Sequence, residues 1–162
     1  MTYYQVIQNA LNILEHKDDY AYFYGAKGQR LDDATMDALI RCEPEHFAQY
    51  TERQLKLIRD YSRGKIGLDC SGFINACTGQ ENYSTGYYTE TLNKTTPALG
   101  TEGNLLYTTW GGKGRHVGLD IGYGFFLHFP KEGHSCEIGR IKETAWENSG
   151  QIRDVDYTGA KN

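Results

Sequence analysis

The sequence predicts an α+β fold in which helices come first and an antiparallel sheet follows. Three observations predict it. Apolar residues recur at helical spacing over much of the first 64 positions, the spacing changes to two from Asn104 onward, and another helix begins beside Cys70. The length of 162 residues fits the usual size of one domain, so we expect a single domain over residues 1–162.

The first predicted helix opens the chain. Its apolar residues lie at i, i+4, i+7, i+8 and i+11, which places them on one stripe of a helix with 3.6 residues per turn. They are Tyr3, Ile7, Ala10, Leu11 and Leu14. We expect this stripe to pack against the core.

Residues 32–64 are also predicted to be helical. Asp32 can cap a first helix, and Pro44 either stops it or starts another segment. Thr51 and Gln54 have the spacing of a capping box for a second helix, which Gly64 can end. The inward-facing apolar residues are then Met36, Leu39, Ile40, Leu55, Ile58 and Tyr61. This pair of helices is expected to stand beside a cleft.

A third helix is predicted to begin at or beside Cys70, with Phe73, Ile74 and Cys77 on its buried face. The free N–H groups and the dipole at a helix N-terminus favour an anion. Together with an imidazolium they can lower the pKa of a cysteine from ~8.5 into the range ~3.5–7.5. The same N–H groups can hold an oxyanion. Cys70 is therefore a candidate nucleophile.

The second half of the chain is predicted to form an antiparallel sheet. Apolar residues alternate with polar ones in three segments, at residues 104–108, 115–122 and 125–129. Between the halves, residues 80–103 are rich in Thr, Tyr, Asn and Gly, and a short helix is expected near residues 87–92.

Two histidines lie on the predicted hairpin, twelve positions apart, at His116 and His128. If residues 122–124 form a three-residue loop, Gly118 faces His128, and His116 lies diagonally from His128 on the same face. A two-residue loop would shift the pairing by one and place His128 on the opposite face. A side chain at position 118 would crowd the two imidazoles, and we expect this to be the reason for the glycine there.

Composition excludes several classes of protein. The net charge of −4 and the pI near 5.7, with scattered Lys and Arg, argue against a nucleic-acid partner. The apolar runs are too short to span the ~30 Å core of a bilayer, so we expect a soluble chain without a membrane partner. The N-terminus has neither a basic nor an apolar region of a secretory signal.

The remaining cysteines and histidines have less specific contexts. Free Cys is usually buried, so Cys42, Cys77 and Cys136 are expected to be structural, and no disulfide is expected at Cys70. A zinc site is weakly indicated, since the sequence has no closely spaced ligand pair. Its ligands would be Cys70, His116, His128 and Cys136. For His16 and His46 we expect surface positions.

Two motifs resemble those of the NlpC-type cell-wall cysteine peptidases, which have a papain-like fold. One is Asp-Cys-Ser-Gly at residues 69–72, and the other is His-Val-Gly at residues 116–118, followed by a later histidine. Tyr22 to Gly25 resembles the Tyr-x-x-Gly element of this family, although here roughly forty residues separate it from the cysteine. We therefore expect a helical insertion at about residues 27–64. The matching stretches cover about a fifth of the chain.

The resemblance implies a role for each matched residue. Cys70 is then the nucleophile, His116 the general base, and His128 the group that orients the base, with His134 as a competitor for that last role. Tyr22, Asp69 and Ser71 are implied to contact the amino group of a peptide stem. All three also have simpler explanations, because Asp69 can cap the helix, Ser71 can fill its first turn and Tyr22 can belong to the core.

The resemblance implies a peptidoglycan hydrolase that needs no metal or organic cofactor. The expected reaction is cleavage of an amide bond of the stem peptide, between D-γ-glutamate and the diamino acid, through an acyl-enzyme on Cys70. One alternative is a CHAP-type amidase or endopeptidase of the cell wall. Another is a non-catalytic wall-binding or phage structural module. We expect a monomer acting on stem peptides at the bacterial cell wall, and a phage lysin, a trimmed secreted enzyme and a cytoplasmic enzyme all remain open.

Overall fold

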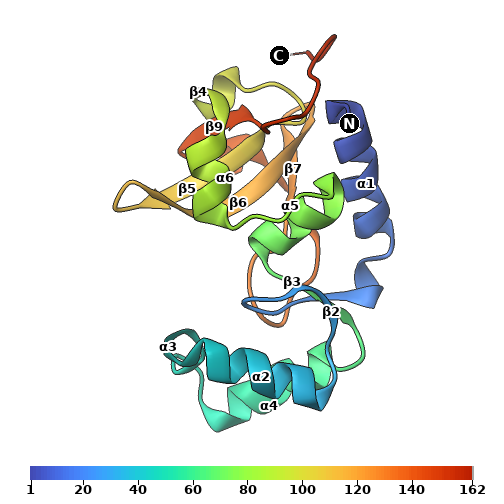
Figure 1. The fold of residues 1–162 in the computed structure, drawn as a ribbon, viewed down its shortest axis with the longest axis vertical. Coiled ribbons are helices and arrows are strands. Elements are labelled where there is room, and N and C mark those ends of the chain that lie inside the picture. The colour runs from blue at the N-terminus through green and yellow to red at the C-terminus, as the bar shows by residue number, and fades with distance from the viewer. Residues whose placement is uncertain (162) are drawn as a thin grey trace.

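The computed structural model describes residues 1–161 and confirms the α+β class (Figure 1). The α-helices are α1 (Tyr3–Glu15), α2 (Asp33–Cys42), α3 (Pro44–Phe47), α4 (Glu52–Ser62), α5 (Cys70–Thr78) and α6 (Ser84–Glu90). Short 3₁₀ helices are η1 (Lys17–Asp19), η2 (Pro97–Leu99) and η3 (Ile141–Glu143). The strands are β1 (Tyr20–Tyr22), β2 (Lys27–Arg30), β3 (Ile66–Leu68), β4 (Leu92–Thr95), β5 (Leu105–Trp110), β6 (Lys113–Gly122), β7 (Phe125–His128), β8 (Glu137–Arg140) and β9 (Asn148–Gln151).

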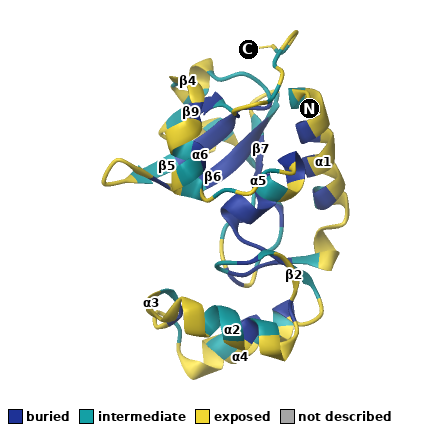
Figure 2. Cartoon of the chain, in the orientation of Figure 1, coloured by how far each residue is buried: buried dark blue, intermediate teal, exposed yellow. Residues whose placement is uncertain are grey.

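The main sheet has six strands in the order β4-β9-β5-β6-β7-β8, and every neighbouring pair is antiparallel. Helix α5 lies between this sheet and α1 (Figure 1). The apolar side chains of these three layers form the larger core, which appears in dark blue at the centre of Figure 2. The expected sheet is confirmed, with β4, β8 and β9 added to the three predicted strands.

A second, smaller sheet leads the chain to Cys70. Its order is β1-β3-β2, with β1 parallel and β2 antiparallel to the central β3. Strand β3 ends one residue before Asp69, so this sheet fixes where α5 begins. Three-residue strands are too short to show a sequence period, and this sheet was not predicted.

The three helices α2, α3 and α4 form a separate layer at the lower end of the molecule in Figure 1. Their apolar side chains meet those of the β1–β2 segment in a second core. Its buried members are Ala21, Phe23, Ala26, Leu31, Met36, Phe47 and Ile58. The predicted insertion thus begins as a strand at residues 27–30 and is mainly helical from residue 33 onward. We propose that residues 27–64 are an insertion within a single domain.

The predicted ends of these helices are confirmed. Asp32 caps α2 by accepting a 2.7 Å hydrogen bond from the amide of Thr35. Thr51 and Gln54 form both hydrogen bonds of a capping box at α4. Gly64 follows this helix with a φ of +82°, a conformation that glycine adopts without strain.

Helix α1 is present, but the predicted buried stripe was wrong in part. Its buried residues are Val6, Ile7, Ala10 and Ile13, whereas Leu11 is exposed. The buried face of α1 is therefore rotated toward Val6 and Ile13. These two apolar residues lie at helical spacing from Ile7 and Ala10, which belong to the predicted stripe. Tyr3 lies at the margin and stacks on Tyr157, with ring centroids 5.9 Å apart. The predicted short helix is α6, which begins three residues earlier than expected.

Candidate active site

Cys70 is the first residue of α5, as predicted. Asp69 caps this helix, because its Oδ1 accepts a 2.7 Å hydrogen bond from the amide of Gly72. The amide of Asp69 in turn donates to the carbonyl of Ala26 at 3.0 Å. A side chain at Gly72 would place its Cβ 2.6 Å from that same carbonyl oxygen. The chain before β2 therefore packs directly on the start of α5.

The two predicted histidines meet on the β6–β7 hairpin. Nε2 of His116 lies 2.9 Å from Nδ1 of His128, so one ring donates a hydrogen bond to the other. Glu137 lies on the far side of His128, with its Oε2 4.0 Å from Nε2 of that ring. His134, the competing candidate, hydrogen-bonds to Glu137 instead. Of the two candidates, only His128 is in contact with His116.

The hairpin reaches this register in a different way from the one predicted. Leu119 pairs with Leu127, as expected for the three-residue loop, but Gly122 pairs with Phe125. The loop therefore has two residues, and a bulge at Ile121 takes up the extra residue of β6. A bulge adds one residue to one strand only, so it cancels the shift that a two-residue loop would otherwise impose.

Trp146 packs on the histidine pair and was missed from the sequence. Its ring stacks on His116, with centroids 5.5 Å apart and planes 11° from parallel, and it meets His128 edge-on at 6.0 Å. A Cβ on Gly118 would lie 3.0 Å from this ring. The predicted reason for Gly118 was therefore wrong: the glycine makes room for Trp146. Trp146 lies in a segment between η3 and β9 without regular structure, and no sequence period connects it to the hairpin.

Burial keeps both partners of the predicted catalytic pair neutral. It raises the pKa of the Cys70 thiol to about 12, with Asp69 adding to the rise, while the Val117 amide, Lys27 and the Ser71 amide oppose it. Burial also lowers the pKa of His116 to about 3. The predicted lowering of the thiol pKa was wrong, because desolvation outweighs the helix N-terminus. His116 is thus an unprotonated base.

The histidine pair should make the protein sensitive to acid. Burial lowers the pKa of His128 to about 4, so below pH 6.5 the unfolded chain binds a proton that the folded chain resists. The free energy of unfolding should therefore fall as the pH drops from 6.5 toward 4. Between pH 7 and pH 5, the free energy of unfolding of the wild type should fall by about 2 kcal/mol more than that of His128→Gln, measured by urea unfolding. His16→Gln, at an exposed position, should match the wild type, and equal losses in wild type and His128→Gln would contradict this assignment.

Cys70 and His116 line one cleft of about 820 Å³. Tyr22, Asp69 and Ser71 line it as well, so the structure brings all three predicted binding residues to the nucleophile. A second cavity, of about 970 Å³, shares no lining residue with this cleft; Trp146 lines it, and none of the predicted site residues does.

The helical insertion forms part of the wall of this cleft through Glu43, His46 and Gln49. The predicted surface position for His46 was wrong. Its ring stacks on Tyr24 with centroids 3.9 Å apart, and its Nε2 lies 2.6 Å from Oε1 of Glu132. No local sequence pattern indicates this contact, because the two residues are 86 positions apart.

The four cysteines are free. Cys77 and Cys136 are buried, as expected, whereas Cys42 is exposed, so the expected buried position of Cys42 was wrong. Among residues 1–161, no three His, Cys, Asp or Glu side chains are grouped closely enough to hold a metal ion. Over the same residues, no helix has the length and apolar character needed to cross a membrane.

A helix that begins at a buried cysteine and packs on an antiparallel sheet carrying a histidine pair defines a papain-like α+β protein. The chain belongs to the NlpC/P60 family, because the model of that family matches residues 47–152. This confirms the resemblance inferred from the motifs around Cys70 and His116. Helices α1 and α2 lie outside the matched residues.

Comparison with individual proteins gives a similar result. The chain is 36% identical over 89 residues to a gamma-D-glutamyl-L-lysine dipeptidyl-peptidase of Bacillus subtilis (strain 168). That match takes in 51% of this chain and 30% of the relative, so the chain matches less than a third of the relative's length.

Two solved structures show the same fold. The NlpC/p60 domain of the peptidoglycan hydrolase SagA has a TM-score of 0.60 and 18% identity, covering 94% of this chain and 100% of that one. RipD of Mycobacterium tuberculosis, described as a non-catalytic NlpC/p60 domain protein adapted to peptidoglycan binding, has a TM-score of 0.55 and 14% identity, covering 91% of this chain and 98% of that one. At such identities the likeness concerns the fold alone.

Proposed function

We propose that this protein is a cysteine peptidase that hydrolyses an amide bond in the stem peptide of peptidoglycan at the bacterial cell wall. The observation that carries the proposal is the contact between His116 and His128 beside the cleft that Cys70 lines. Family membership supports peptidoglycan as the substrate. The Bacillus subtilis relative supports the bond between D-γ-glutamate and the diamino acid as the one cleaved.

Each of the three residues would have one role. His116 would take the proton of the Cys70 thiol as the sulphur attacks the amide carbonyl, since burial keeps both groups neutral. The amides of Ser71 and Val117, which donate to the sulphur, favour the charge that then develops. The imidazolium of His116 would protonate the leaving amine, and a water molecule activated by the same ring would release the acid.

His128 would orient the base. Its hydrogen bond to Nε2 of His116 fixes the ring of the base and leaves Nδ1 for the thiol proton. Trp146 restricts rotation of the same ring by stacking on it. Tyr22, Asp69 and Ser71 would contact the substrate on the side of the cleft next to the helix start.

The masses of soluble products from purified cell walls test this proposal. We expect the intact protein to release fragments with a new amino group on the diamino acid and a new γ-carboxyl group on D-glutamate. A CHAP-type amidase or endopeptidase would release fragments cut at other amide bonds, which differ in mass. Walls whose stem peptides differ in the diamino acid would show which one is accepted.

A non-catalytic binding module is the second candidate, because RipD has this fold and is described as non-catalytic. It predicts binding to walls without release of any new amino group. Amine release by the intact protein would exclude it.

A further inference from the structure

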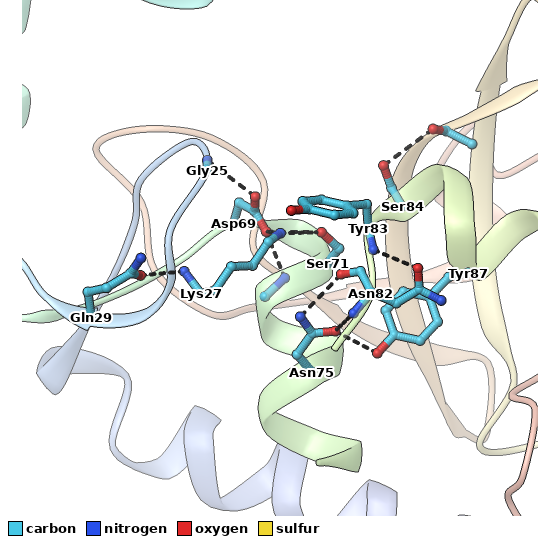
Figure 3. A network of polar contacts seen from close by, with 12 residues as sticks. Gly25, Lys27, Gln29, Asp69, Ser71, Asn75, Asn82, Tyr83, Ser84 and Tyr87 are labelled. Carbon is cyan, nitrogen blue, oxygen red and sulfur yellow. Dashed lines mark hydrogen bonds and ion pairs between the residues drawn. The ribbon is translucent and has the colours of Figure 1, made fainter. Parts of the chain in front are cut away.

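The ammonium group of Lys27 lies between the two side chains that flank Cys70 in the sequence (Figure 3). Its Nζ is 2.6 Å from Oδ1 of Asp69 and 2.6 Å from Oγ of Ser71, and it lies 5.1 Å from the ring centroid of Tyr83. Asp69, Ser71 and Tyr83 all line the cleft. Lys27 itself is not among the lining residues. Its ammonium group reaches the wall of the cleft through these three side chains and binds the two polar groups next to the nucleophile.

The main chain holds this lysine in place. Lys27 opens β2 and pairs with Leu68, the residue that precedes Asp69. The carbonyl of the preceding residue, Ala26, accepts a hydrogen bond from the amide of Asp69. Only about a quarter of the Lys27 side chain is exposed, 23%. The lysine is thus part of the structure around the helix start.

The hydrogen-bonding capacity of Asp69 is largely used within the protein (Figure 3). Its Oδ1 accepts from the amide of Gly72 at 2.7 Å, from the hydroxyl of Ser71 at 3.1 Å and from Lys27. Its Oδ2 accepts from the amide of Gly25 at 3.2 Å. A second ammonium group at this place would be repelled by the positive charge of Lys27, and it would have to displace Lys27 to reach the carboxylate.

We propose that Lys27 occupies the site that a substrate ammonium would take beside Cys70, so that the cleft selects stem peptides whose amino end is acylated. A neutral amide can lie against this site without opposing the lysine charge, whereas a free terminal ammonium cannot. Acylated amino ends are those of stems still joined to their glycan. This inference rests on the proposed function for the identity of the substrate, and it adds which form of the stem is accepted.

The test compares one peptide in two forms, L-alanyl-γ-D-glutamyl-L-lysyl-D-alanine with a free amino end and the same peptide N-acetylated. Binding of each is measured by calorimetry to the Cys70→Ala protein, and hydrolysis by the protein with Cys70 intact. We expect the acetylated peptide to bind at least about tenfold more tightly and to have the higher kcat/KM. Lys27→Ala in the same backgrounds should shift the ratio toward the free peptide by about tenfold or more.

The ratio between the acetylated and the free peptide is taken within one variant, so a general loss of folded protein or of thiol reactivity affects both values equally. Lys27→Arg keeps the charge and should keep the preference for the acetylated peptide. Lys56→Ala, on the outer side of α4 with a mostly exposed lysine, is the matched control and should leave the ratio unchanged. Added ethylammonium should restore the preference in Lys27→Ala, because a small cation can refill the site.

Equal binding of the two peptides, binding of neither, or an unchanged ratio in Lys27→Ala would overturn the inference. If both peptides are cleaved without preference, the proposed function stands and the inference fails. If the acetylated peptide binds preferentially but neither is cleaved, the inference stands and the proposed function fails.

Discussion

Replacing Cys70 with alanine is expected to abolish the release of amino groups from cell walls. The acyl-enzyme needs a nucleophile at the start of α5, and the variant leaves no thiol in the cleft because the other cysteines do not line it. Removal of a catalytic nucleophile in hydrolases costs up to about 10⁶ in kcat. We expect a loss of at least about 10⁴, measured as new amines per unit time from purified sacculi.

Two controls separate chemistry from folding in this experiment. Cys42→Ser changes an exposed thiol that does not line the cleft and should keep the wild-type rate. Cys70→Ala should keep the free energy of unfolding, measured in urea, within about 1 kcal/mol of the wild type, since the removed thiol is small. Unchanged amine release by a folded Cys70→Ala protein would refute the role of this cysteine.

Replacing Glu132 with alanine is expected to destabilise the attachment of the helical insertion. This carboxylate is buried, with 1% of its side chain exposed, and it accepts hydrogen bonds from His46 and from Tyr50 at 2.7 Å. Burial raises the pKa of the Tyr50 hydroxyl, and the Glu132 carboxylate adds to the rise. Hydrogen bonds to a charged group contribute about 1.5–3 kcal/mol each, and the partners left behind remain partly buried.

We expect Glu132→Ala to lower the free energy of unfolding by about 2–4 kcal/mol, measured in urea at pH 7.5. Glu132→Gln keeps the shape and one acceptor, so it should lose less. Glu143→Ala removes an exposed carboxylate of η3 and should be close to neutral. A loss no larger in Glu132→Ala than in Glu143→Ala would show that the contact does not stabilise the insertion.

The parts of the fold that could be predicted are those with a local signal. Helix α5 follows from Asp69 and the apolar residues after it, and α4 follows from its capping box. The β6–β7 hairpin follows from alternation. Strands β4 and β9 are short and polar, Leu92–Thr95 and Asn148–Gln151, and pair with each other at the edge of the sheet. Their position depends on long-range pairing, which no local period signals.

The same division holds for the candidate site. Cys70, His116 and His128 could be selected because motifs surround them. Whether the two imidazole rings meet depends on the pairing of β6 with β7, which the alternation in the hairpin allowed us to predict. Lys27 and Trp146 reach the site from segments far away in sequence, 42 residues before Asp69 in the case of Lys27. A side chain that acts through tertiary packing alone has no pattern of its own.

The stacking of Trp146 on His116 also gives the protein an internal optical reporter. The other tryptophan, Trp110, is 80% exposed, so its fluorescence reports on solvent. In a Trp110→Phe background the remaining indole emission comes from beside the proposed base, and a protonated imidazole quenches an indole that it touches. Charge on that ring could then be followed by light during turnover, without a label and without altering the cleft.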